Sequence, residues 1–476
     1  MARRKAAQRF GKQAVRKSVR APKFPADRLP AELIHMVFTY LKPTEAAGFR
    51  WAGRVVAEIG LQYLAPTAYL TLKEESYDRL LAIAGHPTVS KYVVELDYET
   101  EGLRPMARED FDRMIRRTGV IPQRNDSSER PDSCASARAW RAYQRESLRN
   151  IPVFNQRQTK QLLNRAWSMY EADYASQKKV QQANFFREKT AKAIEQFPYL
   201  ERVFTSADGA YERYAAEIKG FLPTYYFSHC SAHRYPSSVG ATSSVLLAAE
   251  SAGLHLDYFR CSINWQVFTQ NEKDLATFKR SLLHLKVMII TFTIRRDMRR
   301  DRMVQEYTYI RWQCLENGHV LDLITSSPDL EHLALSFETL PEPIFYPTLN
   351  ETMGNFYWHS LKTVNLESLF SDDDDLLMFC KRHAHTLKDL SLTDMRLHKG
   401  SWDVTFHRMR QTFRLGQQLA TCKLRGLFWS PERVLDLGPR GEGHNNAAGI
   451  VTSDYIRASN IGDISLDEYY EAVGLK

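Results

Sequence analysis

Two short stretches of the sequence bring together side chains that bind metal ions in other proteins. HCSAH, from His229 to His233, and CKRHAH, from Cys380 to His385, place cysteine and histidine close together, and both are common zinc ligands. Neither stretch has a second ligand pair at zinc-finger spacing. We therefore expect no metal site at either stretch.

Two further stretches resemble parts of phosphate and calcium sites. GPRGEGH, residues 438 to 444, lacks the Lys-Ser/Thr pair of a phosphate-binding loop and is not flanked by a strand and a helix. SDDDD, from Ser371 to Asp375, lacks the glycine and distal glutamate of a calcium loop, and it stands before a helical pattern whose N-terminus favours acids. We expect a mobile loop and a helix start, respectively. The G-x-S-x-G, H-E-x-x-H and G-x-G-x-x-G motifs are absent, so we expect a non-catalytic chain without a cofactor.

The composition is that of a globular protein. The chain has 476 residues, 43% of them hydrophobic, and no apolar run reaches the length of a membrane span. Its six cysteines have no paired spacing, which favours a reducing, intracellular setting in the nucleus or cytoplasm. They are Cys134, Cys230, Cys261, Cys314, Cys380 and Cys422.

The positive charge is concentrated at the start of the chain. The formal net charge is +9, and the first 28 residues hold ten Lys or Arg against one acid, Asp27, so the other residues sum to zero. Residues 1–24 are therefore expected to form a disordered basic arm that attracts a polyanion or an import receptor. A solvated tail without a fixed partner and an Arg-rich mitochondrial presequence are the alternatives.

Residues 25–66 are predicted to form a small helical module. In LPAELIHMVFTYLKP the apolar residues follow helical spacing, Pro30 suits the first turn, and Pro43 is expected to end the helix. Thr44 is expected to cap a second helix, and residues 48–64 continue helically with one or two breaks. Such a module is too small to enclose a full core.

From residue 67 onward, strand and helix patterns alternate, which predicts parallel β-α-β units. The predicted strands share a skeleton that is apolar at positions one, four and six, at offsets that fall mostly in or near the leucine-rich-repeat range. The skeletons are Thr67, Leu70, Leu72; Val93, Leu96, Tyr98; Leu200, Val203, Thr205; Leu256, Phe259, Cys261; Leu282, Leu285, Val287; Leu330, Leu333, Leu335; Leu361, Val364, Leu366; Leu387, Leu390, Leu392; and Leu419, Cys422, Leu424.

The fold class expected from these patterns is α/β: a short helical module followed by an irregular leucine-rich-repeat-like solenoid over residues 67–435. An unrelated α/β fold is the alternative. Residues 104–195 interrupt the repeats with a polar loop and a helical insertion, and residues 436–476 are expected to form a flexible loop and a C-terminal helix.

The helical module resembles the F-box family. Its pattern of Leu-Pro, Glu-Leu, an apolar segment ending in Tyr-Leu, a proline and a later arginine is matched by Leu29, Pro30, Glu32, Leu33, Val37, Tyr40, Leu41, Pro43, Phe49 and Arg54. The sequence departs from the pattern at Ala46, Ala52 and Gly53.

The resemblance implies a substrate receptor of a Skp–cullin–F-box ubiquitin ligase, in which the F-box binds the Skp adaptor, the adaptor binds a cullin, and the repeats hold a protein substrate. The residues that it places at the adaptor or in the core beneath are Leu29, Pro30, Leu33, Ile34, Val37, Phe38, Leu41 and Phe49. An F-box scaffold or tether outside a ligase, and a basic-arm nuclear or chromatin-binding protein, are the alternatives.

The substrate is expected to meet the strand side of the solenoid, because partners of leucine-rich repeats usually bind there. Outward positions beside the apolar skeletons are Glu331, His332, Lys362, Thr363, Lys388 and Asp389. Their charges are mixed in sign, which favours a protein substrate over nucleic acid.

Overall fold

The computed structural model describes residues 29–41, 43–99, 101–103, 107–117, 156–181, 185–206, 235–236, 238–269, 272–293, 301–338, 346–415, 419–437, 447–457 and 465–473. The basic arm, the polar loop at residues 123–138, the HCSAH stretch and the GPRGEGH stretch lie outside these residues. Its contacts divide the chain into two units, Met1–Pro66 and Thr67–Lys476, which we call the N-terminal and C-terminal units.

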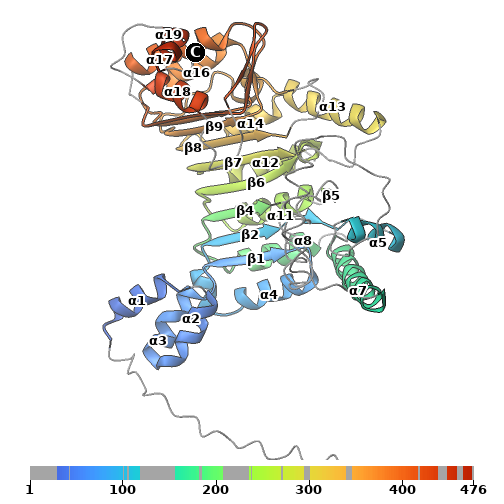
Figure 1. Ribbon diagram of the computed structural model, residues 1–476. Helices are drawn as coiled ribbons and strands as arrows, with labels where there is room; N and C mark the ends of the chain where they lie inside the picture. Colours follow the sequence, from blue (N-terminus) through green and yellow to red (C-terminus); the bar gives the residue numbers. More distant parts are fainter. Residues whose placement is uncertain are drawn as a thin grey trace, which may run out of the picture. The chain divides into compact units, whose positions relative to one another are not determined.

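The N-terminal unit is helical (Figure 1). It contains α1 (Ala31–Thr39), α2 (Pro43–Phe49), a 3-10 helix (Arg50–Ala52), α3 (Arg54–Ile59) and a second 3-10 helix (Gly60–Tyr63). The expected cap at Thr44 is wrong, because α2 already begins at Pro43. A proline fits the first helical position, where no backbone N–H is needed, so Pro43 starts a helix after α1 has ended at Thr39.

The C-terminal unit has the expected mixed α/β class with parallel strands. Nine strands form one parallel sheet in the order in which they occur along the chain. The strands are β1 (Thr67–Thr71), β2 (Glu95–Glu99), β4 (Arg202–Ser206), β6 (Tyr258–Asn264), β7 (Val287–Thr293), β8 (His332–Phe337), β9 (Thr363–Glu367), β11 (Asp389–Thr393) and β13 (Thr421–Arg425). A separate pair joins β3 (Glu101–Gly102) to β5 (Tyr235–Pro236).

Helices connect the strands and line up in the same order (Figure 1). They are α4 (Glu74–Ala84), α8 (Phe185–Ile194), α11 (Ser238–Ser251), α12 (Glu272–Ser281), α13 (Asp301–Glu316), α14 (His319–Thr325), α15 (Leu349–Met353), α16 (Asp373–His383), α17 (Trp402–Leu415) and α18 (Ala447–Arg457), with 3-10 helices at Val89–Tyr92 and Trp265–Thr269. The charges at both ends of α16 interact favourably with the helix dipole. Its first turn contains three aspartates, and its last turn contains Lys381, Arg382 and His383.

The helices cover one face of the large sheet and leave the other less buried. Side chains along β7, β8, β9 and β11 alternate between buried and half-buried, as expected for a sheet packed on one side. The buried positions join the helices in one continuous apolar core that extends from Ala68 to Leu466. Within it, the rings of Phe292 and Phe337 stack with centroids 4.6 Å apart. We call the less buried side the open face.

Strand pairing corrects two of the predicted skeletons. Phe259 pairs with Met288, so the skeleton of β7 is Leu285, Met288 and Ile290, all buried, and not Leu282, Leu285 and Val287. Likewise Leu96 pairs with Ala68, which moves the first skeleton by two residues from Thr67, Leu70 and Leu72. Both errors arise because overlapping apolar residues fit the same pattern in more than one register.

A left-handed residue follows each of the three last described strands of the large sheet. Ser368, Asp394 and Gly426 have φ angles of 61°, 50° and 78°. Each turns the chain into a short strand of a second sheet, whose order is β10 (Phe370–Ser371), β12 (Arg396–Leu397), β14 (Leu427–Trp429) and β15 (Val434–Asp436). The first three strands are parallel and β15 is antiparallel to β14. This segment of the chain therefore repeats strand, left-handed turn, short strand and helix.

The predicted insertion contains α5 (Arg108–Arg117) and α7 (Gln156–Gln181). Phe111 of α5 packs edge-on against Trp167 of α7, with ring centroids 5.2 Å apart. The buried Gln177 side chain accepts from the backbone N–H of Leu103 and donates to its carbonyl oxygen, which ties α7 to the chain after β3. The predicted helical insertion thus includes α7, on which Leu163 and Tyr170 are buried.

The middle of the predicted flexible loop lies outside the described residues, but its two ends are described. Leu437 is buried, and residues 447–449 begin α18, which packs on β13 at the edge of the large sheet. The predicted closing helix is α19 (Leu466–Ala472), whose first turn is capped reciprocally by Ser465 and Glu468.

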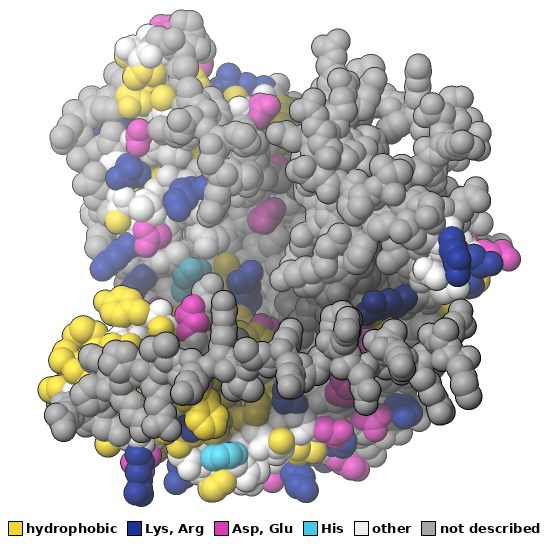
Figure 2. Space-filling view, turned by 60° about the horizontal axis from the view of Figure 1, so that its bottom comes forward, with side chains coloured by type: hydrophobic (Ala, Val, Ile, Leu, Met, Phe, Trp, Pro, Cys, Tyr) yellow, Lys and Arg dark blue, Asp and Glu magenta, His cyan; other side chains and the backbone are white. Residues whose placement is uncertain are grey.

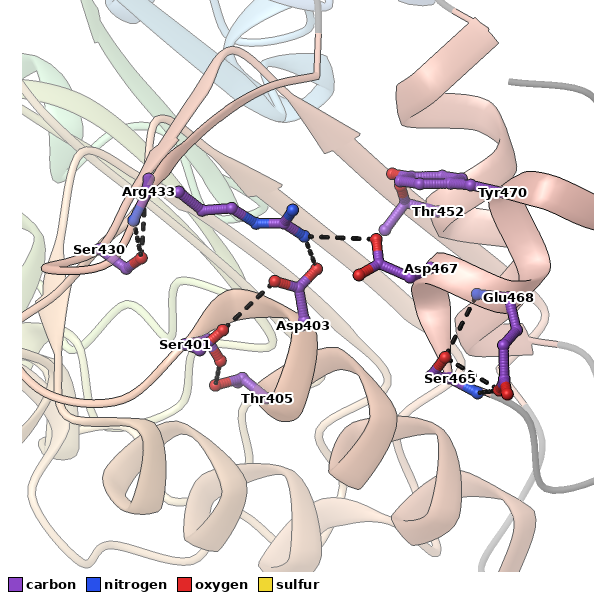
Figure 3. A network of polar contacts seen from close by, with 10 residues as sticks. All are labelled: Ser401, Asp403, Thr405, Ser430, Arg433, Thr452, Ser465, Asp467, Glu468 and Tyr470. Atoms are coloured by element: carbon purple, nitrogen blue, oxygen red, sulfur yellow. Dashed lines mark hydrogen bonds and ion pairs between the residues drawn. The ribbon is translucent and has the colours of Figure 1, made fainter. Parts of the chain in front are cut away.

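Arg433, after β14, bonds to Asp403 at the start of α17 and approaches Asp467 of α19 at 3.9 Å (Figure 3). A bond between Thr452 and Tyr470 joins α18 to α19 (Figure 3).

Candidate partner-binding surfaces

Helix α1 has two apolar faces with different environments. Ile34 and Phe38 are buried and form a small core with Ala46 and Val56. Leu33, Met36, Val37 and Tyr40 follow the i, i+3, i+4, i+7 spacing of one helix face, and they remain 44%, 55%, 37% and 83% exposed. The second face is an apolar stripe without cover in the described chain, and we call it the outer stripe.

Aromatic packing fixes the inner face of α1. The ring of Phe38 stacks on Tyr63 with centroids 5.1 Å apart and meets Phe49 edge-on at 5.3 Å. A side chain at Gly60 would collide with the Phe38 ring, so glycine is needed for this approach. The Nδ1 atom of His35 lies 3.0 Å from the Tyr63 hydroxyl and holds α1 to the last 3-10 helix of the unit. These contacts set the rotation of α1 and thereby keep its outer stripe facing outward.

The eight predicted adaptor residues therefore separate into groups. Pro30, Leu33 and Val37 are exposed, Ile34 and Phe38 are core residues, and Leu29, Leu41 and Phe49 pack partly buried against that core. The prediction omitted Met36, Tyr40, Trp51 and Val55, of which Trp51 is 93% exposed. The face shown in Figure 2 also carries exposed hydrophobic side chains on its left side, among charged side chains of both signs.

The open face of the large sheet is the second candidate surface. Strand register places its side chains in rows that cross all nine strands. The central row is Tyr69, Asp97, Phe204, Arg260, Ile289, Ala334, Asn365, Ser391 and Lys423. In the middle of the sheet this row has the apolar or aromatic Phe204, Ile289 and Ala334 together with Arg260, and towards β11 it is polar.

Polar side chains on the open face bond across neighbouring strands. Asp389 accepts from Thr421 at 2.6 Å and from Thr363 at 3.3 Å. Ser336 donates to Glu367 at 2.9 Å. These bonds hold the side chains in place, so the polar surface on β8 to β13 is ordered in advance.

The six predicted outward residues fall on two different parts of the sheet. His332, Thr363 and Asp389 begin their strands on the open face, in one row. Glu331, Lys362 and Lys388 stand one residue earlier, where backbone hydrogen bonds link the segments that precede neighbouring strands. Glu331 and Lys362 form an ion pair of 2.6 Å, and this hydrogen bond lowers the pKa of the Glu331 carboxyl.

The CKRHAH stretch is part of the core. Cys380 and His383 are buried in α16, and burial raises the pKa of the Cys380 thiol to about 12. The Nε2 atom of His383 accepts from the Trp358 backbone N–H, and its Nδ1 donates to the Phe379 carbonyl. Both ring nitrogens are therefore occupied by backbone groups, which leaves neither for a metal ion.

The SDDDD stretch starts a helix, as its position predicts. Asp372 is the residue before α16, although its side chain makes no capping bond. Lys399 pairs with Asp372, and Arg408 pairs with Asp373 and Asp374. These ion pairs connect α16 to α17 and to the loop before it. Among the described residues, no group of three or more His, Cys, Asp or Glu is arranged to hold a metal ion.

Comparison of the sequence with models of known protein families and with curated protein sequences gives no match. In the described ranges, no helix has the length and apolar content needed to cross a membrane. The functional argument therefore depends on the two surfaces themselves.

Proposed function

We propose that this chain is a substrate receptor of a Skp–cullin–F-box ubiquitin ligase. The N-terminal unit binds the adaptor through the outer stripe of α1, and the C-terminal unit holds a protein substrate on its open face. The observation that carries the proposal is the division of α1 into a buried face and an exposed apolar face on a separate small unit.

The outer stripe has the composition of a protein-binding surface. Leu33, Val37 and Tyr40 are large side chains that are exposed to water, and their exposure does not stabilise the N-terminal unit. Adjacent exposed apolar side chains of this kind mark protein-binding sites. Fully burying one such aliphatic side chain stabilises a complex by about 1.5 to 3 kcal/mol, so a few of them offset the entropy lost on association.

The C-terminal unit supports a leucine-rich solenoid as the receptor domain. Its strands follow one another in chain order, and the skeletons of β8, β9, β11 and β13 have the predicted spacing. The left-handed turns at Ser368, Asp394 and Gly426 repeat at matching positions. Stacked repeats of this kind present a long ordered surface on the strand side, which suits a protein substrate.

The receptor contributes proximity, because the ubiquitin-transfer chemistry belongs to other subunits of the ligase. Holding a substrate near the transfer site replaces an encounter between separate molecules. The mixture of charged, polar and apolar side chains on the open face matches the composition of protein-binding surfaces.

Affinity isolation of the full chain with the Skp adaptor tests the proposal. Leu33→Asp combined with Val37→Asp places charges on the outer stripe without touching the small core, so adaptor recovery should fall to background while the chain stays folded. Phe38 is a poor choice for this test, because its ring lies in the core. Unchanged adaptor recovery would refute the adaptor-binding role.

A matched control is Val404→Asp on α17. Val404 is 52% exposed, like Leu33, but it lies on the C-terminal unit, so this change should leave adaptor recovery intact. Cullin should be recovered together with the adaptor, and a substrate should accumulate when the chain is deleted. Recovery of adaptor without cullin, and without an accumulating substrate, would favour the scaffold role instead.

A further inference from the structure

The second sheet of the C-terminal unit exposes a row of large side chains. Register pairs Phe370 with Arg396, Arg396 with Trp429, and Trp429 with Val434, so one row crosses all four strands. Leu427 shares the face of Trp429 because it lies two residues away on the same strand. Leu427, Trp429 and Val434 are 52%, 41% and 50% exposed. We call these five residues the aromatic–arginine face.

Aromatic rings hold the guanidinium of Arg396. Its central carbon lies 4.1 Å from the ring centroid of Tyr346 and 5.8 Å from that of Phe370. The ring of Phe370 is in turn stacked on His398 with centroids 4.2 Å apart. Contacts of this kind fix the plane of the guanidinium and leave its N–H groups free to donate at the edge.

Arg396 differs from the other cations in this segment of the chain. Arg433 bonds to Asp403, Arg408 pairs with Asp373 and Asp374, and Lys399 pairs with Asp372. Among the described residues, the contacts of the Arg396 guanidinium are with the rings of Tyr346 and Phe370, and no carboxylate forms an ion pair with it. A pre-oriented arginine without a carboxylate, beside an exposed tryptophan, is a site prepared for an external anion.

The backbone beneath the face is firmly anchored. The indole N–H of the buried Trp402 donates to the carbonyl of Trp429 at 2.9 Å, and the Asp394 carboxylate accepts from the N–H of Leu427 at 2.9 Å. Arg433 links the turn after β14 to α17 and α19 (Figure 3). A partner therefore binds without ordering these strands first, which reduces the entropic cost of association.

We propose that the aromatic–arginine face is a docking site for a protein segment that carries an Asp or Glu beside a large apolar residue. The carboxylate pairs with the guanidinium of Arg396, and the apolar side chain packs on Trp429, Leu427 and Val434. Tryptophan, tyrosine and arginine are the residues that dominate protein–protein binding energies. This site is separate from the open face, and it does not depend on the proposed ligase function.

Charge argues against a single-stranded nucleic acid at this face. Such ligands also stack on aromatic rings, but they need several cations along their backbone. The aromatic–arginine face has one, Arg396. A nucleotide also has no aliphatic side chain that could pack on Leu427 and Val434.

Selection of peptides tests the inference. A displayed random peptide library is selected on the full-length chain, and the consensus peptide is synthesised for binding measurements. We expect peptides with an acidic residue beside a large apolar residue. Trp429→Ala should lower the affinity for the consensus peptide at least about tenfold, as expected for a hot-spot residue. Arg396→Glu should switch the selection to peptides with Lys or Arg in place of the acid.

Two further variants make the test decisive. Trp312→Ala removes a tryptophan of similar exposure, 47%, from α13 and should leave peptide binding unchanged. Arg396→Lys keeps the charge but loses the planar guanidinium, so it is a milder change that should still weaken binding. No enriched peptide, peptides without an acidic residue, equal binding to Arg396→Glu, or a single-stranded oligonucleotide bound at this face instead would each overturn the inference.

Discussion

Asp394 and Gly426 occupy the same turn position in neighbouring repeats and depend on each other. The Asp394 carboxylate accepts the N–H of Leu427 at 2.9 Å, and a Cβ atom at position 426 would collide with that carboxylate. Gly426 also has a φ angle of 78°, which side chains disfavour. The turn therefore needs an acid on one strand and a glycine on the next.

Gly426→Ala should destabilise the C-terminal unit by more than backbone strain alone. The left-handed conformation costs a non-glycine residue about 1 to 3 kcal/mol, and displacement of the Asp394 carboxylate adds to this. Urea unfolding of the full chain measures the loss. Gly253→Ala is the control, because Gly253 also has a positive φ, 66°, but a side chain there enters open space. An equal loss for both variants would show that the contact with Asp394 has no effect.

The stability of the C-terminal unit should fall below neutral pH because of His383. Burial lowers the pKa of this imidazole to about 4, from an ordinary value of 6.5. Below pH 6.5 the unfolded chain binds a proton that the folded chain excludes, because a protonated Nε2 would face the N–H of Trp358. The contribution of neutral His383 to the free energy of unfolding is thus fully present above pH 6.5 and is lost as the pH falls towards 4. At pH 5 the loss is about 2 kcal/mol.

Urea unfolding at pH 7 and pH 5 measures this loss. His383→Gln should be less stable than the parent chain at pH 7 but should lose less on acidification. His385→Gln is the control, because His385 is exposed two residues away. If His383→Gln and the parent chain respond equally to pH, another group is responsible.

Phe38→Ala should destabilise the N-terminal unit, whereas changes on the outer stripe should not. Removing a buried phenylalanine costs about 3 to 5 kcal/mol, and this small core has few other residues to compensate. Hydrogen exchange of residues 31–63 should accelerate in Phe38→Ala and remain slow in Val37→Ala. Slow exchange in both variants would contradict the assignment of Phe38 to the core.

The sequence predicts the periodicity of the C-terminal unit better than its register. Leucines at residues 330, 333 and 335 stand alone, so only one alignment of that strand fits the pattern. In LLHLKVMII two alignments fit, and pairing with β6 selects the one that buries Met288. The aromatic–arginine face was not predicted, because its residues come from four strands whose adjacency no local pattern reveals. On α1, helical spacing predicted the apolar surface, but the packing of Phe38 on Tyr63 decides which part of it faces outward.

The corrected register of β7 leads to a direct test. Met288→Ala removes a fully buried side chain and should cost about 2 to 5 kcal/mol. Val287→Ala changes the adjacent residue on the open face and should cost less than about 1 kcal/mol. Denaturant unfolding of the two variants distinguishes the alignments, and a larger loss for Val287→Ala would restore the alignment that the sequence alone suggested.

Arg433 should hold the last helix to the rest of the C-terminal unit. It bonds to Asp403 of α17 and approaches Asp467 of α19, and all three side chains are partly exposed. Exposed ion pairs usually contribute less than about 1 kcal/mol each, so Arg433→Ala should loosen α19 without unfolding the sheet. Hydrogen exchange of residues 465–473 should accelerate, and raising the salt concentration should reduce the difference from the parent chain, because ions screen such pairs. Arg457→Ala, which removes a pair confined to α18, should leave the exchange of residues 465–473 unchanged. Equal exchange in Arg433→Ala and the parent chain would mean that the Ser465–Glu468 cap and the bond between Thr452 and Tyr470 hold α19 without Arg433.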